Sequence, residues 1–158
     1  MQTPFADKQW SDRFKQLGNL AETAFEDWAK KNEVQVERMG FRGSHLPRNA
    51  MLQLPTHVKH TPDYLAYKNS RLKWVECVGT ADKSRFKIRL SKHEGQHWWN
   101  RDLEVAYFLY HSPSDSFGWT TWQDISDEIV GGAPLEHFNV DGNSYYVIGV
   151  DPDSWKRL

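Results

Sequence analysis

The stretch from Thr61 to Lys92 restricts the possible folds of this chain more than any other segment. Two short strand-like runs stand on either side of a turn signal, Asn69-Ser70, and this pattern predicts a β-hairpin. Each run carries one isolated acid, Asp63 in the first and Glu76 in the second. Antiparallel pairing across the turn brings these two positions together. The stretch therefore predicts two carboxylates side by side on neighbouring strands.

Two adjacent carboxylates can hold a divalent cation in front of a phosphate, and Mg²⁺ typically takes one or two carboxylates together with water. The alternative is that both acids only face solvent. That alternative is strained for Glu76, whose immediate neighbours are mostly apolar, because a carboxylate in such surroundings is costly unless it is paired or bound to a metal. We therefore expect a Mg²⁺ site, in which Mn²⁺ can substitute, formed by Asp63, Glu76 and the backbone carbonyl of Cys77.

The remaining segments show the periodicities of helices and strands in turn. Asn19 is a good N-cap for the clearest helix, and Ser91 with Glu94 matches the capping box of a later one. The expected order is a helix over 7–16, an interruption or bend at Gly18-Asn19, a helix over 20–32, strand 33–39, loop 41–60, strands 63–68 and 72–78, basic strand 85–90, a helix from 91, buried strand 105–110, loop 112–117, helix 119–130 and strand 145–150. This order predicts a single α/β domain spanning 1–158, with a central mixed sheet flanked by helices.

Charge is distributed unevenly along the chain, although the net charge is only −1. Residues 1–112 contain 18 Lys and Arg against 13 Asp and Glu, a balance of +5, whereas residues 113–158 contain 2 against 8, a balance of −6. Arg85, Lys87 and Arg89 alternate with apolar residues, so one face of their strand is basic. A basic excess beside the two acids favours a polyanion as the partner, and ordinary surface variation is the alternative.

The cellular setting follows from what the sequence lacks. Cys77 is the one cysteine, so no internal disulfide can form, which fits a reducing compartment. No apolar run approaches the ~18–20 residues of a membrane span, and no apolar signal-peptide core follows the N-terminus. We expect a soluble, cytoplasmic protein with no membrane partner.

Pro62-Asp63, twelve further residues and then Glu76-x-Val78 resemble the PD-(D/E)xK motif of the restriction-endonuclease-like nuclease superfamily. That superfamily includes Holliday-junction resolvases, phage exonucleases and repair nucleases. Its core is a helix, a three-stranded hairpin sheet, a second helix and a further strand. The resemblance covers residues 19–110 and implies an αβββαβ core there, with 113–158 as a C-terminal α/β extension.

The resemblance also implies roles for particular residues. Many members carry a Glu on the first helix that joins or supports the metal site, and Glu22 is similar to that residue. The family usually has a Lys two residues after the second acid, where it orients water and stabilises transition-state charge, but here that position is Val78. Either the lysine has moved to a neighbouring element, with Lys87 the first choice and Lys92 and Lys83 next, or the domain has kept the fold and lost cleavage.

The expected function is Mg²⁺-dependent hydrolysis of DNA phosphodiester bonds, in a protein of phage or mobile-element type. The alternatives are a non-catalytic nucleic-acid-binding or assembly protein on the same fold, and a structural protein whose acids form only salt bridges. Homo-oligomers are common on this fold, and the acidic segment 113–158 is a candidate interface. The residues expected to act are Asp63 and Glu76 on the metal, Glu22 and Lys87 in catalysis, and Arg85, Arg89 and Lys92 on DNA phosphates.

Overall fold

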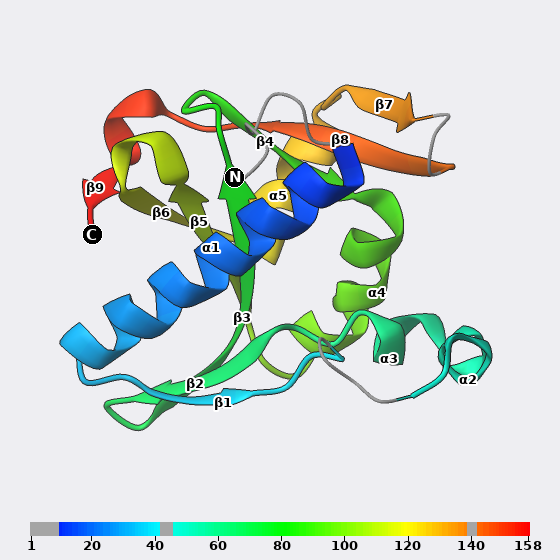
Figure 1. The fold of residues 1–158 in the computed structure, drawn as a ribbon, viewed down its shortest axis with the longest axis horizontal. Helices are drawn as coiled ribbons and strands as arrows, with labels where there is room; N and C mark the ends of the chain where they lie inside the picture. The colour runs from blue at the N-terminus through cyan, green and yellow to red at the C-terminus, as the bar shows by residue number, and fades with distance from the viewer. Residues whose placement is uncertain (1–9, 42–45, 139–141) are drawn as a thin grey trace, which may run out of the picture.

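A mixed six-stranded sheet forms the centre of the protein (Figure 1). The computed structural model describes residues 10–41, 46–138 and 142–158. The strands of this sheet are β1 Gln35–Arg38, β2 Tyr64–Lys68, β3 Arg71–Thr80, β5 Val105–His111, β6 Ser116–Thr121 and β9 Lys156–Arg157. β1, β2 and β3 form antiparallel pairs, β5 lies parallel to β3, and β6 and β9 continue the sheet as antiparallel strands. β3 therefore lies inside the sheet, between β2 and β5.

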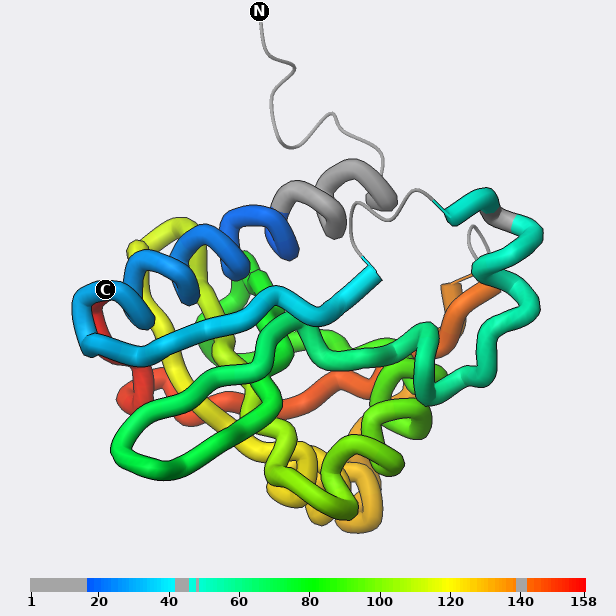
Figure 2. Tube along the Cα trace, turned by 90° about the horizontal axis from the view of Figure 1, so that it is seen from below, coloured from blue at the N-terminus to red at the C-terminus, as the bar shows by residue number. Residues whose placement is uncertain are grey.

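Helices cover both faces of this sheet (Figures 1 and 2). α1, Trp10–Lys31, crosses one face, and α4, Leu90–Asn100, lies with α5, Trp122–Val130, on the other. β5 is buried on both faces, as its continuous apolar sequence predicts. Phe108 packs in the core beneath α1, and Tyr107 packs in the core that contains α5 residues. None of the helices in the described ranges is long and apolar enough to cross a membrane.

A second sheet of three strands contains the basic segment. Its strands are β4 Arg85–Arg89, β8 Asn143–Gly149 and β7 Leu135–Phe138, in the order β4-β8-β7. The predicted alternation in β4 is confirmed, since Phe86 and Ile88 are buried between the basic positions. β4 pairs with β8 rather than with a strand of the acid-bearing hairpin. The partner strand of the basic segment thus comes from about 60 residues further along the chain.

The predicted α/β class and the order of a helix, three strands, a helix and a further strand are confirmed. The expected loop 41–60 contains two short helices, α2 Arg48–Gln53 and α3 Thr56–Lys59. The expected loop 112–117 contains a 3-10 turn, η2 Ser112–Ser114, and the start of β6, so the following helix begins later than predicted. A second 3-10 turn, η3 Pro152–Ser154, precedes β9.

α1 runs without interruption through Gly18-Asn19, so the predicted interruption there and the predicted N-cap at Asn19 are wrong. The helix backbone packs directly on β3, where a Cβ on Gly79 would lie 2.2 Å from the carbonyl oxygen of Leu17. Tertiary packing of this kind outweighs the local preference of Gly and Asn for helix ends. Residues 7–9 of the first predicted helix lie outside the described residues.

α4 begins at Leu90, and its N-cap Arg89 makes no side-chain cap hydrogen bond. The predicted Ser91–Glu94 capping box is therefore wrong. The helix is instead fixed by its neighbours: α3 packs so closely that a Cβ on Gly95 would lie 2.9 Å from the His60 side chain. α4 thus takes its position from tertiary contacts.

His93 joins α4 to α5. Its ring stacks on Trp122 with the centroids 4.8 Å apart, and its Nε2 lies 3.1 Å from the hydroxyl of Ser126. The buried Nδ1 has no hydrogen-bond partner among the described residues. Burial, followed by the nearby His97, lowers the pKa of His93 to about 4. Protonation of this imidazole is therefore easier in the unfolded chain than in the folded protein.

We expect the free energy of unfolding to fall as pH falls from 6.5 to about 4, because the unfolded chain takes up a proton that folded His93 excludes. His93→Phe keeps a ring against Trp122 and removes the titration. Its stability curve should be flatter than that of the unsubstituted protein by up to about 1.4 kcal/mol per pH unit. Urea unfolding of both proteins at several pH values measures this difference, and equal slopes would contradict the assignment.

Candidate functional site

Asp63 and Glu76 lie side by side, as expected from the hairpin pattern. β2 and β3 pair as far as Tyr64 opposite Val75, so Asp63 stands one residue beyond the last pair, next to Glu76. Oδ2 of Asp63 accepts a 2.8 Å hydrogen bond from the backbone N–H of Cys77. Both acids line one cavity of about 380 Å³. The hairpin therefore presents two carboxylates to the same space.

The backbone carbonyl of Cys77 faces the same edge of β3. In an extended strand the N–H and the C=O of one residue point to the same side. Because the N–H of Cys77 points to Asp63, the carbonyl also points to this side and away from β5. The thiol itself is buried, and burial together with the nearby acids raises its pKa well above the usual value. Cys77 thus offers a backbone oxygen, while its thiol stays protonated.

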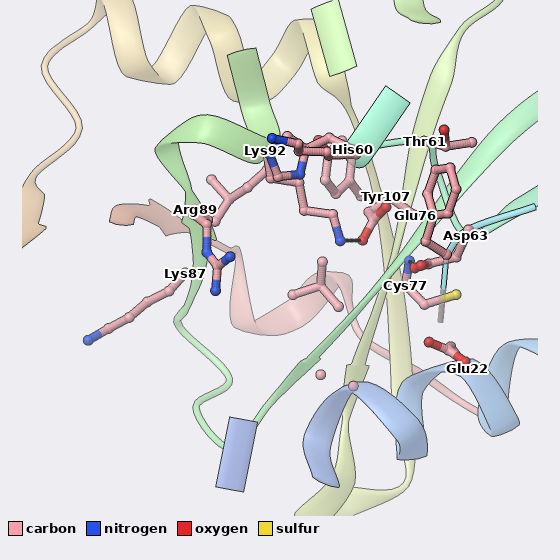
Figure 3. A pocket seen from close by; sticks show the side chains of 17 residues that line it. Glu22, His60, Thr61, Asp63, Glu76, Cys77, Lys87, Arg89, Lys92 and Tyr107 are labelled. Carbon is pink, nitrogen blue, oxygen red and sulfur yellow. Dashed lines mark hydrogen bonds and ion pairs between the residues drawn. The ribbon is translucent and has the colours of Figure 1, made fainter. Parts of the chain in front are cut away.

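The ammonium of Lys92 contacts Glu76 from the first turn of α4 (Figure 3). Nζ donates to Oε1 of Glu76, whose side chain is only 1% exposed. Glu76 and Val78 point to the same side of β3, because side chains alternate along a strand. Val78 lines the same cavity. Lys92 therefore brings a positive charge from α4 to Glu76, the acid two residues before Val78.

Gln96 and Tyr107 complete a buried hydrogen-bond chain behind Glu76. Nε2 of Gln96 donates to Oε2 of Glu76 at 2.7 Å, and the hydroxyl of Tyr107 donates to Oε1 of Gln96. All three residues are 0% exposed. The hydroxyl of Tyr107 fixes the orientation of the amide, so that its NH₂ group faces the acid. The chain therefore holds the Glu76 carboxylate in one orientation.

Glu76 and Lys92 influence each other's pKa. Burial and the neighbouring Asp63 raise the pKa of Glu76, and Lys92 opposes this rise. Burial acts to lower the pKa of Lys92, but Glu76 and Asp63 outweigh it and raise that pKa to about 12. Both donors to Glu76 occupy lone pairs of its oxygens, so the geometry describes an ion pair.

Lys87, the first choice for the displaced lysine, points away from the acids (Figure 3). Its Nζ lies 2.5 Å from Oε2 of Glu136 on β7 and 4.6 Å from the ring centroid of Phe138. Lys87 is nevertheless one of the residues that line the cavity. The structure thus brings Lys92, the second choice, to Glu76 and leaves Lys87 with an acid of the second sheet.

The predicted DNA-binding arginines lie in different places. Arg89 lines the cavity, and its guanidinium points into it (Figure 3). Arg85 is absent from the cavity lining among the described residues, and its Nε lies 2.8 Å from Oδ2 of Asp82. Arg89 and Lys92 therefore line the same cavity, whereas Arg85 lies apart from both.

Glu22 is buried in α1 and lines the cavity, but its carboxylate pairs with Arg38. Oε2 of Glu22 lies 3.0 Å from the guanidinium of Arg38, which also contacts Glu26 and the hydroxyl of Tyr64. In Figure 3, Cys77 stands between Glu22 and the two strand acids. The predicted supporting role of Glu22 in the site stays a prediction.

The two strand acids fit a divalent cation with few protein ligands. Within the described ranges, no group of three or more His, Cys, Asp and Glu side chains could hold a metal ion. Mg²⁺ needs no such group, since it keeps several waters and is commonly held by one or two carboxylates. Asp63 raises the pKa of Glu76 through its charge, and a cation between the two acids would remove this repulsion. Asp63, Glu76 and the Cys77 carbonyl suit that role.

Sequence reasoning missed Gln96 and Tyr107, as well as Lys59 and His60, which line the cavity or its back wall. One signal pointed to Gln96: it lies four residues after Lys92, and residues at this spacing share a helix face. Tyr107 carried no such signal, because it sits within a continuous apolar run. Lys59 and His60 lie in the segment expected as loop.

No family profile matches the sequence, and no curated protein does so either. Among solved structures, this chain is similar to D212, a nuclease from a fusselovirus. The likeness covers 100% of this chain and 90% of that chain, with 15% sequence identity and a TM-score of 0.47.

Proposed function

We propose that this protein is a metal-dependent nuclease that hydrolyses phosphodiester bonds in DNA. One observation carries the proposal: the ammonium of Lys92 reaches Glu76 in the same cavity as Asp63. Two carboxylates and one cation are the groups that metal-assisted phosphodiester hydrolysis requires. Val78 removes the lysine from its usual position, and Lys92 supplies the same charge from α4.

The residues divide the work by their chemistry. Asp63, Glu76 and the Cys77 carbonyl would hold Mg²⁺ or Mn²⁺, which supplies an activated water and neutralises charge on the phosphate. Gln96 keeps the Glu76 carboxylate oriented toward that position. Lys92 stabilises the negative charge that develops on the phosphate during cleavage. These roles need no sequence preference in the DNA.

The proposal predicts that Asp63→Ala abolishes cleavage. Linear, nicked, branched and single-stranded DNA are incubated with the unsubstituted protein and the variant, in Mg²⁺ and in Mn²⁺. The variant should lose at least about 10²–10³-fold in rate, because one of the two acids is removed. Asp102→Ala, at an exposed position after α4, is the matched control and should cleave normally.

The outcomes separate the candidate functions. Cleavage that survives Asp63→Ala would contradict the metal assignment. Salt-sensitive DNA binding without cleavage by the unsubstituted protein would favour a non-catalytic nucleic-acid-binding protein on this fold. Neither binding nor cleavage would favour a structural role.

A further inference from the structure

One side of the cavity is basic, and it is assembled from three separate elements. Lys59 ends α3 and His60 follows it, Arg89 ends β4, and Lys92 lies in α4. Asp63 lies on the opposite side, and Glu76 lies between Asp63 and Lys92 (Figure 3). The cavity therefore has an acidic side for a metal and a basic side that faces it.

Lys59 and Arg89 form no ion pair with an acid of the described residues, unlike Lys92 beside them. Nζ of Lys59 donates to the carbonyl of Leu52 at 2.9 Å. The guanidinium of Arg89 lies 3.5 Å from the hydroxyl of Tyr145 and 5.8 Å from the centroid of its ring. In the described part of the chain, ion pairs with acids involve other cations, such as Lys92 and Lys87.

His60 lies among these cations. α4 closes over its ring at Gly95, where a Cβ would lie 2.9 Å from two of its side-chain atoms. Burial, followed by the charges of Lys92, Arg89 and Lys59, lowers the pKa of His60 to about 4. The neutral imidazole keeps one N–H to donate. An anion at this position would interact with the positive charges of Lys59 and Arg89 and could accept a hydrogen bond from His60.

We propose that Lys59, His60 and Arg89 form a second phosphate subsite, which binds the DNA phosphate next to the one that is hydrolysed. This inference rests on the proposed function, because the acids define where the first phosphate lies. Phosphates recur at every nucleotide of a strand, so a strand with one phosphate at Asp63 also brings its neighbouring phosphates to the walls of the cavity. Lys59, His60 and Arg89 include no carboxylate that could hold a metal ion, so they are separate from the ion site. The subsite fixes the register of the strand without reading its sequence.

Binding without metal tests this subsite separately from cleavage. Fluorescence anisotropy in EDTA measures the Kd of labelled single-stranded and duplex oligonucleotides at several salt concentrations. Lys59→Gln and Arg89→Gln should each weaken binding about 5–20-fold and reduce the salt slope by about one, because each removes one phosphate contact. Lys156→Gln, on β9, is the matched control and should change neither quantity. Unchanged affinity and slope in both cavity variants would overturn the proposal.

Oligonucleotides with and without a terminal phosphate separate the two possible sources of the anion. An equal loss for both kinds supports an internal phosphate of the strand. A loss confined to phosphorylated ends would overturn that assignment in favour of a terminal phosphate.

NMR titration of the unsubstituted protein gives a test that no folding defect can affect. The pKa of His60 should rise from about 4 when an oligonucleotide binds, because the phosphate offsets the neighbouring cations. An unchanged titration in the bound state would overturn the subsite. The proposed nuclease function fails on a different result, the absence of Asp63-dependent cleavage in metal.

Discussion

Lys92→Gln should lower the rate of metal-dependent DNA cleavage by about 10²–10³-fold. Lys92 is the cation in contact with Glu76, and it lies where a charge can act on the phosphate. Glutamine keeps a hydrogen-bond donor for Glu76 and removes only the positive charge. Single-turnover kinetics at saturating enzyme and saturating Mg²⁺ measures the chemical step, so that weaker DNA binding does not enter the comparison.

Lys87→Gln is the matched control, because its ammonium lies against Glu136 instead of the strand acids. It should cleave within about threefold of the unsubstituted rate. Loss of activity in Lys87→Gln together with full activity in Lys92→Gln would mean that Lys87, and not Lys92, acts on the phosphate. Urea unfolding of both variants shows whether either change acts through the fold, since an uncompensated buried carboxylate is itself costly.

A chemical rescue separates charge from structure at this position. Lys92→Cys should be inactive. Alkylation with 2-bromoethylamine converts the new cysteine into a lysine analogue in which sulfur replaces one methylene, and it should restore a measurable part of the rate. Cys77 should not compete for the reagent, because it is buried and its thiol pKa is raised. A variant that stays inactive after complete alkylation would show that Lys92 acts by packing.

The pair of acids could be predicted because it depends on local structure. A turn at Asn69-Ser70, where both residues adopt positive φ, sets the register of β2 against β3. That register alone places Asp63 beside Glu76, and no distant part of the chain is needed. The burial of Glu76 was likewise visible in its apolar neighbours. Local pairing and local polarity are what a single sequence shows best.

The position of the lysine could not be predicted because it depends on contacts that are distant in sequence. The alternation in β4 shows which of its residues share a face, but the neighbour of that face is decided by β8 and β7. Glu136 lies 49 residues after Lys87 and captures its ammonium. Lys92 reaches Glu76 only because α4 is held against α3 and α5, and no periodicity reveals that arrangement.

Gly79→Ala should destabilise the folded protein by about 3 kcal/mol or more, the largest stability effect expected for so small a change. The added Cβ would lie 2.2 Å from the carbonyl oxygen of Leu17 and 2.6 Å from its carbonyl carbon. Both atoms belong to the backbone of α1, so no side-chain rotation can relieve the clash and the helix must move away from β3. Urea unfolding without metal measures the effect.

The same movement should disturb the site, because α1 also carries Glu22, which lines the cavity. Gly118→Ala on β6 is the matched control: its Cβ would lie 3.8 Å from the ring of Trp155, an ordinary van der Waals contact. That change should alter the free energy of unfolding by less than about 1 kcal/mol, because alanine also restricts the unfolded chain. Equal stability of the two variants would mean that α1 does not approach β3 at Gly79. The continuity of the helix through Gly18-Asn19 would then lack its physical cause.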